Sequence, residues 1–220
     1  MSTIGGKYFD FTLKNASSML VAGPTESGKS TFVHALLNNL DIFEQPPTKI
    51  YYFYGEFNEA LLKLPSHIII HEGLPDNLND IEPNSLVVVD DLMHETKNDS
   101  SLTNAFTRTV HHKKLFVINI TQNFYEQSGD ARTRRLNVQY IALFKNPADV
   151  TQVNTLGRQM YPTCPKFLPA VYNEVTRRPH GYLFIDLKQA TPDEYRIRSN
   201  ILPNQFPMFT FYLKNCLPHV

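Results

Sequence analysis

The segment GPTESGKST, residues 23–31, has the residue types and the spacing of a phosphate-binding loop. In the pattern Gly-x4-Gly-Lys-Ser, glycines let backbone N–H groups turn onto phosphate oxygens at a helix N-terminus. The lysine neutralises the β- and γ-phosphates, and the serine hydroxyl ligates Mg²⁺. The pattern therefore predicts a site for ATP and Mg²⁺, with Lys29 on the phosphates and Ser30 on the metal. The residues expected to line this site are Gly23, Pro24, Thr25, Glu26, Ser27, Gly28, Lys29, Ser30 and Thr31.

Two carboxylates, Asp90 and Asp91, end the apolar run SLVVVDD. In a parallel sheet, a carboxylate at the carboxyl end of a strand faces the same crevice as the phosphate-binding loop, so Asp90 is predicted to hold the Mg²⁺ shell. Asp91 is then predicted to orient or deprotonate the attacking water. Without the loop, two acids that merely begin a surface loop would be an equally good interpretation.

An amide pair, Gln122 and Asn123, ends the run ITQN. A glutamine offers both a donor and an acceptor while staying uncharged, so Gln122 is predicted to sense the γ-phosphate and relay its loss. The alternative interpretation is a polar pair that only begins a loop.

Arginines are candidates for stabilising the transferring phosphoryl group, and a finger from a neighbouring subunit would couple hydrolysis to assembly. We prefer the cluster ARTRR, and within it Arg134 and Arg135, followed by Arg108. Each arginine could instead be a surface or structural residue. The full set of candidates is Arg108, Arg132, Arg134, Arg135 and Arg158.

The elements that must position these residues alternate between short apolar runs and helix-like stretches, which is typical of an α/β fold with a largely parallel sheet. Strands are predicted at residues 18–23, 49–54, 67–71, 85–91, 114–123 and 139–146. Helices are predicted at residues 28–39, 100–112 and 148–160. A strand pair at 181–187 and 194–200, joined by a turn around Pro192 and Asp193, is expected to follow.

The order of these elements favours one class of P-loop protein. Two predicted strands lie in sequence between the strand of the loop and the strand that ends in Asp90 and Asp91. This layout predicts a three-layer P-loop NTPase with a mostly parallel central sheet of the additional-strand (ASCE) type, plus the C-terminal strand pair. Nucleotide kinases and GTPases fit less well, because the sequence shows no NKxD guanine-reading motif and no arginine-rich lid between the two motifs. We expect a single domain over residues 1–220, with a core at about 11–162 and a C-terminal appendage at about 163–220.

Charge is unevenly distributed along the chain although the formal net charge is zero. Residues 1–100 carry 14 acidic side chains against six lysines and no arginine, whereas residues 101–220 carry 15 basic against seven acidic side chains. The later part is therefore a candidate for contacts with DNA or with a neighbouring subunit's nucleotide. An ordinary dipolar surface is the alternative.

No apolar run approaches the ~20 residues that cross a bilayer, and the N-terminus lacks the basic-then-apolar pattern of a signal peptide. The two cysteines, Cys164 and Cys216, have no metal-type spacing and are expected to be free thiols in a reducing compartment. These features predict a soluble, intracellular protein with no membrane partner.

Four segments together resemble viral genome-packaging ATPases of the FtsK/HerA superfamily: GPTESGKST, LVVVDDLM, VINITQNFYEQSGDARTRRLNVQYIALFKNP and LGRQMYP. The nearest likeness is to the poxvirus-type packaging ATPases and their relatives in large virus-like DNA transposons of animals. The resemblance covers about residues 11–162, and RPHGYLFIDL with RIRSNILP also looks like the tail of the transposon-encoded proteins.

What the resemblance implies is a ring-forming motor, a hexamer or pentamer, that threads double-stranded DNA into a capsid at the expense of ATP. Its partners would be DNA, further copies of itself and a viral capsid or portal vertex. It would act in the host cell cytoplasm or nucleus, or in association with the virion. By position, Lys29 and Ser30 are the nucleotide and Mg²⁺ residues, Asp90 the Mg²⁺ acid, Asp91 the base and Gln122 the sensor.

One position departs from the superfamily pattern. Many members have glutamate at the base position, whereas Asp91 is one methylene shorter, so Glu26 and Glu95 remain alternative bases. Two other functions stay open on the residues alone: a small-molecule or nucleotide kinase that uses the same loop, and a non-catalytic scaffold that binds nucleotide in order to assemble with its partners.

Overall fold

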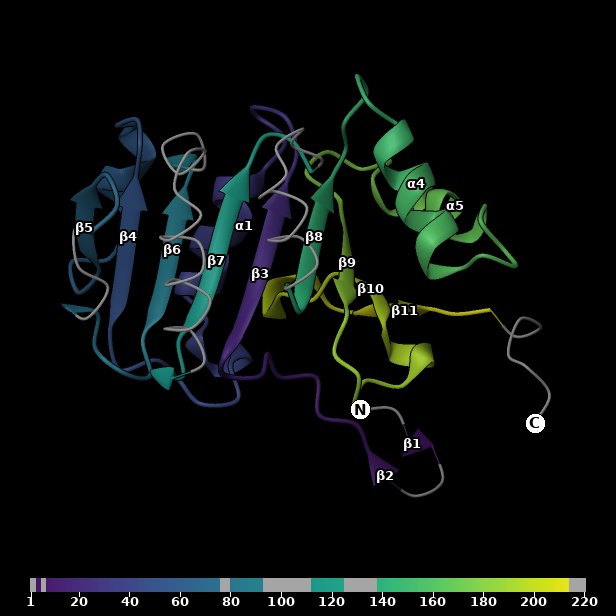
Figure 1. The fold of residues 1–220 in the computed structure, drawn as a ribbon, viewed down its shortest axis with the longest axis horizontal. Coiled ribbons are helices and arrows are strands. Elements are labelled where there is room, and N and C mark those ends of the chain that lie inside the picture. The colour runs from purple at the N-terminus through teal and green to yellow at the C-terminus, as the bar shows by residue number, and fades with distance from the viewer. Residues whose placement is uncertain (1–2, 5–6, 76–79, 93–111, 125–137, 214–220) are drawn as a thin grey trace.

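Nine strands of the protein form one sheet in the order β11-β10-β9-β8-β3-β7-β6-β4-β5 (Figure 1). The computed structural model describes residues 3–4, 7–75, 80–92, 112–124 and 138–213. The strands of the sheet are β3 (Ser17–Ala22), β4 (Ile50–Tyr54), β5 (Ile69–Glu72), β6 (Leu86–Asp90), β7 (Phe116–Thr121), β8 (Tyr140–Phe144), β9 (Tyr182–Asp186), β10 (Ile197–Ser199) and β11 (Phe209–Phe211). A separate antiparallel pair joins β1 (Thr3–Ile4) to β2 (Lys7–Tyr8).

Strand directions divide the sheet into two parts. The strands from β5 to β8 are all parallel, and β9, β10 and β11 add three antiparallel pairings at one side. Strand β7 lies between β3 and β6, so the strand that leads into the phosphate-binding loop is not adjacent to the strand that ends in the two acids. This order confirms the predicted additional-strand type, and it brings the carboxyl ends of β3, β6 and β7 to one edge of the sheet (Figure 1).

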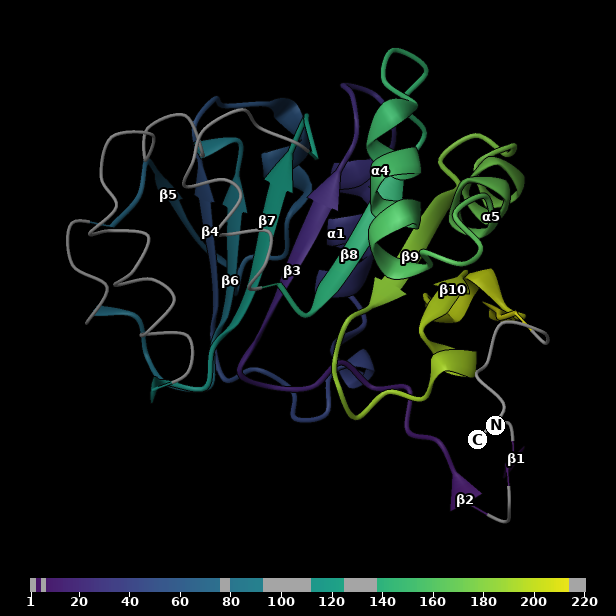
Figure 2. The ribbon, with the colours of Figure 1, turned by 45° about the vertical axis from the view of Figure 1, so that its right-hand side comes forward.

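Helices cover both faces of the sheet, which makes three layers (Figure 2). They are α1 (Lys29–Leu37), α4 (Thr151–Met160) and α5 (Phe167–Val175), with 3₁₀ turns η1 (Leu40–Ile42), η2 (Glu59–Lys63), η5 (Asp193–Tyr195) and η6 (Pro203–Gln205). Because side chains of a strand alternate between faces, Met19 and Val21 of β3 pack in the cluster with α1, and Leu20 and Ala22 pack in the cluster with α4 and α5. The central strand is thus buried on both sides.

Most predicted elements are found, with a few differences. Strand β5 begins at Ile69 and ends at Glu72, and the expected second C-terminal strand starts with η5 before β10. Helix α5 was not predicted. Its sequence FLPAVYNEV contains Pro169, which lies in the first turn, where a backbone N–H has no partner within the helix. Edge strand β11 was also not predicted. The helix expected at 100–112 lies almost entirely outside the described residues.

The structure also bears on the state of the cysteines and on membrane-spanning helices. Cys164 forms a disulfide, so the prediction of a free thiol is wrong for this residue. Among the described residues, no helix has the length and apolar character needed to cross a membrane.

Candidate active site

The phosphate-binding loop joins β3 to α1, as the sequence predicts. The Gly23 N–H donates to the Thr121 carbonyl at 3.2 Å, which holds the start of the loop beside the end of β7. Gly28 has φ 106°, a left-handed conformation that suits glycine, and its carbonyl accepts from Phe32 N–H at 2.9 Å in the first turn of α1. The loop therefore ends on the N-terminus of a helix, the usual setting for phosphate.

The first glycine of the loop is required by close packing. A Cβ atom on Gly23 would lie 2.7 Å from Phe144 Cβ and 2.8 Å from Ser27 Oγ, and β8 leaves no room for it. Ser27 Oγ is itself buried and has no hydrogen-bond partner among the described residues. Thr25, Glu26 and Thr31 are exposed, while Ser30 is half-buried in the first turn of α1.

Lys29 is buried, with only 9% of its surface exposed, and its Nζ donates to the Pro24 carbonyl at 2.8 Å. Burial lowers the pKa of Lys29, because the charged form loses water, and the negative charges of Asp90 and Asp91 oppose this shift. The lysine of the loop and the two acids at the end of β6 therefore interact electrostatically.

Asp90 is fixed from the neighbouring strand. The Tyr52 hydroxyl donates to Asp90 Oδ2 at 2.6 Å, and Tyr52 is only 1% exposed. Tyr52 stands opposite Val88 in the β4–β6 register, so Asp90 is its diagonal neighbour on the same face, within reach of a long side chain. Burial raises the pKa of Asp90; the Tyr52 hydrogen bond lowers it, the Asp91 charge raises it further, and the Lys29 charge lowers it.

Asp91 is held by a different strand. Its φ of 54° is left-handed and takes the chain out of the strand alternation, and its N–H donates to the Ile120 carbonyl of β7 at 3.3 Å. Gln122, just past the end of β7, donates from Nε2 to Asp91 Oδ2 at 2.9 Å. The structure thus brings together the predicted base and the predicted sensor.

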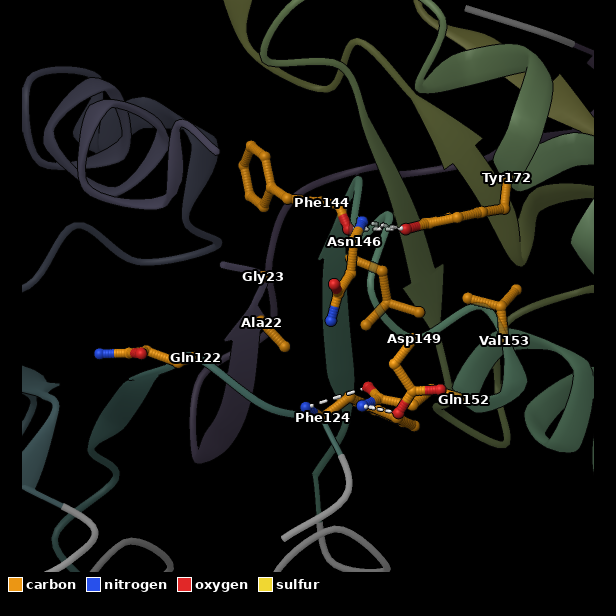
Figure 3. A pocket seen from close by; sticks show the side chains of 11 residues that line it. Ala22, Gly23, Gln122, Phe124, Phe144, Asn146, Asp149, Gln152, Val153 and Tyr172 are labelled. Atoms are coloured by element: carbon orange, nitrogen blue, oxygen red, sulfur yellow. Dashed lines mark hydrogen bonds between the residues drawn. The ribbon is translucent and has the colours of Figure 1, made fainter. Parts of the chain in front are cut away.

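A cluster of hydrogen bonds lies on the other side of Gln122, between the loop and α4 (Figure 3). Phe124 N–H donates to Gln152 Oε1 at 3.2 Å, and Gln152 Nε2 donates to Asp149 Oδ2 at 2.6 Å. The Tyr172 hydroxyl of α5 donates to the Phe144 carbonyl at 2.9 Å, which fixes the end of β8. In Figure 3 the Gln122 amide points away from this cluster, which leaves it to Asp91.

The remaining predicted residues divide into two groups. Glu95, Arg108, Arg132, Arg134 and Arg135 lie outside the described residues. Arg158 is exposed on α4 and donates to Thr155 Oγ1 at 3.2 Å. Asn123 is exposed, and its N–H donates to Thr121 Oγ1 at 3.4 Å.

Two residues that form hydrogen bonds at or beside the site were not predicted: Tyr52, which contacts Asp90, and Gln152, which contacts Phe124. The period-2 alternation of IYYFY places Tyr52 on the same face as Ile50. Together with the strand order and the β4–β6 register, this alternation would have predicted the contact between Tyr52 and Asp90. No signal in the sequence pairs Gln152 with Phe124, because that contact depends on how α4 packs.

No protein-family model matches the chain, and no curated protein matches it. Among solved structures, it is similar to the genome-packaging NTPase B204 of Sulfolobus turreted icosahedral virus 2 in complex with ATP-gammaS, with a TM-score of 0.49 and 14% identity over 83% of this chain and 95% of that chain. It is also similar to the RadB recombinase (TM-score 0.36, 17% identity, 58% of this chain and 74% of that chain). A third similar structure is EccC ATPases 2 and 3 of Thermomonospora curvata (TM-score 0.39, 16% identity, 60% of this chain and 30% of that chain).

The fold itself is established by the strand order and by the loop between β3 and α1: it is a P-loop NTPase fold of the additional-strand type with antiparallel C-terminal strands.

Proposed function

We propose that this chain is an ATP-hydrolysing DNA translocase that packages double-stranded viral DNA into a capsid. One observation carries the hydrolytic part: the loop lysine after β3 and two separately hydrogen-bonded acids after β6, Asp90 and Asp91, lie at the same edge of the sheet. The packaging part is supported by the sequence resemblance.

The residues fit a magnesium nucleotide. The Ser30 hydroxyl and the Asp90 carboxylate are hard oxygen donors of the kind that Mg²⁺ takes alongside water and substrate phosphates. Bound there, Mg²⁺ would neutralise charge on the β- and γ-phosphates. Lys29 would contribute a second positive charge, and the backbone N–H groups of residues 23–31 would bind phosphate oxygens.

Asp91 is the proposed base. Its Oδ2 accepts from Gln122, which leaves Oδ1 to receive the proton of the attacking water as the water oxygen bonds to the γ-phosphorus and ADP leaves. Gln122 would orient the carboxylate through Nε2 and meet the γ-phosphate or the water through the rest of its amide. Loss of the γ-phosphate would then change the position of Asp91.

The proposed assembly is a homo-oligomeric ring, hexameric or pentameric, at a capsid or portal vertex. Arg134, Arg135 or Arg108 would act as the finger on a neighbour's nucleotide, and the basic part of the chain, residues 101–220, would face DNA or that neighbour. We further propose one domain over residues 1–220, because β9 pairs with β8 over five residue pairs and continues the core sheet into the C-terminal region.

The test measures the ATPase rate against protein concentration, with and without double-stranded DNA. Because a finger in trans makes activity depend on assembly, the rate per subunit should rise with concentration and rise again with DNA. Lys29→Ala should abolish it. An unchanged rate at every DNA concentration would contradict the motor, phosphate transfer to a nucleotide or small molecule would indicate a kinase, and nucleotide binding without turnover would indicate a scaffold.

A further inference from the structure

The turn between α5 and β9 contacts the phosphate-binding loop. His180 Nδ1 lies 3.3 Å from the Ser27 carbonyl oxygen, a contact between residues 153 positions apart. A Cβ atom on Gly28 would lie 2.9 Å from His180 Nδ1 and 3.0 Å from His180 Cβ, so the histidine takes the space that a side chain at Gly28 would need. The imidazole therefore packs directly on the Ser27–Gly28 peptide.

The turn that carries His180 is itself tightly fixed. Thr176 is buried and its Oγ1 donates to the Tyr172 carbonyl at 2.7 Å, while Gly181 N–H donates to the Arg178 carbonyl at 3.0 Å. A Cβ on Gly181 would lie 2.2 Å from the Val175 carbonyl oxygen, so only glycine fits there. The histidine is held in a backbone conformation that its neighbours impose.

That backbone conformation is unfavourable for histidine. His180 has φ 59°, in the left-handed region that non-glycine residues seldom adopt. Strain of this kind persists where the surrounding structure over-determines it, and it gathers at ligand-binding sites. Glycine would relieve the strain, so the histidine side chain itself is the feature that needs an explanation.

Packing beyond the turn joins the same two regions. Tyr182, the first residue of β9, has its ring centroid 4.7 Å from that of Phe32 in α1. The C-terminal strands therefore contact both the loop and the helix that follows it.

We propose that His180 is a positioning residue that aims the Ser27–Gly28 peptide at bound phosphate and makes nucleotide affinity depend on the C-terminal strands. The inference rests on the proposed nucleotide site. A carbonyl oxygen only accepts, so Nδ1 carries the proton and donates to it. In a trans peptide the C=O and N–H point in opposite directions, so holding the Ser27 carbonyl on His180 directs the Gly28 N–H away from the turn. A donor fixed in this way binds phosphate with less loss of entropy.

The experiment compares His180→Gly with the wild-type chain. Glycine adopts φ 59° without strain, and the substitution removes only an exposed side chain, so the unfolding temperature should not fall. The dissociation constant for ATP-gammaS should rise about tenfold, the equivalent of ~1.4 kcal/mol for one hydrogen bond and its orienting effect. The kcat at saturating ATP should change less than about twofold, because the reacting atoms are not touched.

Two further variants complete the test. His180→Asn keeps a donor and tolerates the left-handed backbone, so it should recover most of the affinity. Arg177→Ala lies on the same turn and should bind as the wild type does, since among the described residues its side chain forms an ion pair with exposed Glu174 alone, at 3.0 Å.

Failure of this inference differs from failure of the proposed function. If the wild-type chain binds no ATP-gammaS, the proposed nucleotide site and the role proposed for His180 are both wrong. If the wild-type chain binds ATP-gammaS and His180→Gly binds it equally well, the role proposed for His180 is wrong, but the proposed nucleotide site is not. A loss of affinity that comes with a lower unfolding temperature, and that His180→Asn does not recover, would show a purely structural role and would also overturn it.

Discussion

Asp90 and Asp91 are neighbours in the sequence but belong to two different regions of the site. Asp90 is fixed from β4, on the inner side, where the hydroxyl of the fully buried Tyr52 donates to it. Asp91 is fixed from β7, on the exposed side, where the Gln122 amide donates to it. The left-handed backbone at Asp91 separates the two carboxylates.

The difference shows how one residue type can serve two roles. Both carboxylates are half-buried, so the difference lies in their partners. A carboxylate with one oxygen fixed by a buried tyrosine is preorganised as a ligand, whereas a carboxylate beside an exposed glutamine amide can exchange a proton with water. If this division holds, substitutions on the inner side should change metal and nucleotide binding, and substitutions on the exposed side should change turnover.

Asp91→Asn should give the largest effect on turnover. The amide keeps the shape of the side chain but cannot take a proton, so kcat should fall by about 10²–10⁴. Steady-state ATPase assays, paired with ATP-gammaS binding, would measure this, and binding should stay within a factor of about two. Full turnover in Asp91→Asn would move the role of base to Glu26 or Glu95.

Asp90→Asn should act on the metal. Replacing a charged ligand by a neutral one should raise the Mg²⁺ concentration for half-maximal activity by about 10–100-fold, the size of effect seen even for outer-shell partners of a metal. The measurement is an Mg²⁺ titration of ATPase rate at saturating ATP. An unchanged Mg²⁺ dependence with reduced kcat would exchange the roles of the two acids.

Gln122→Ala should have a smaller effect, again on turnover. Loss of the 2.9 Å hydrogen bond leaves Asp91 charged but no longer oriented, and one such bond corresponds to about a tenfold fall in kcat. The matched control is Asn123→Ala, an exposed neighbour whose side chain has no hydrogen bond to the acids among the described residues. An equal loss in both variants would argue against a specific role for Gln122.

The sequence was sufficient for the parts of this comparison that depend on local pattern. The loop motif, the apolar strand before Asp90 and the polar end of β7 are each contiguous, so strand, loop and helix could be predicted from period and composition. The additional-strand order could be predicted because the two strands between the motifs are visible as apolar runs.

The sequence was not sufficient for contacts that cross the fold. Tyr52 meets Asp90 only through the register of β4 on β6, and His180 meets Ser27 only because the α5–β9 turn returns to the loop. Helix α5 was also not predicted; it contains Pro169, a residue that breaks a helix in its interior but is tolerated in the first turn. The roles of the arginines stay predictions, because four of the five lie outside the described residues.

Tyr52→Phe should have the smallest effect on rate and is the sharpest test of the inner side. The ring keeps its packing in the core, but Asp90 loses the donor to Oδ2, which leaves a half-buried carboxylate with one hydrogen bond fewer. The free energy of unfolding should fall by about 1–3 kcal/mol at neutral pH, measured by denaturant titration. Tyr54→Phe, on the same strand, is the matched control, since the Tyr54 hydroxyl forms no hydrogen bond among the described residues, and it should change stability little.

The pH dependence of Tyr52→Phe distinguishes positioning from packing. The Tyr52 hydrogen bond lowers the pKa of Asp90, opposing the larger rise that burial causes, so removing it should raise that pKa further. Mg²⁺ needs the deprotonated carboxylate, hence activity at low Mg²⁺ should be lost at a higher pH in the variant as the solution is acidified. Raised Mg²⁺ should restore it, because metal and proton compete for the same oxygens. A variant with lower stability but the wild-type pH profile would mean that Tyr52 only packs, and the inner region would then owe its preorganisation to burial alone.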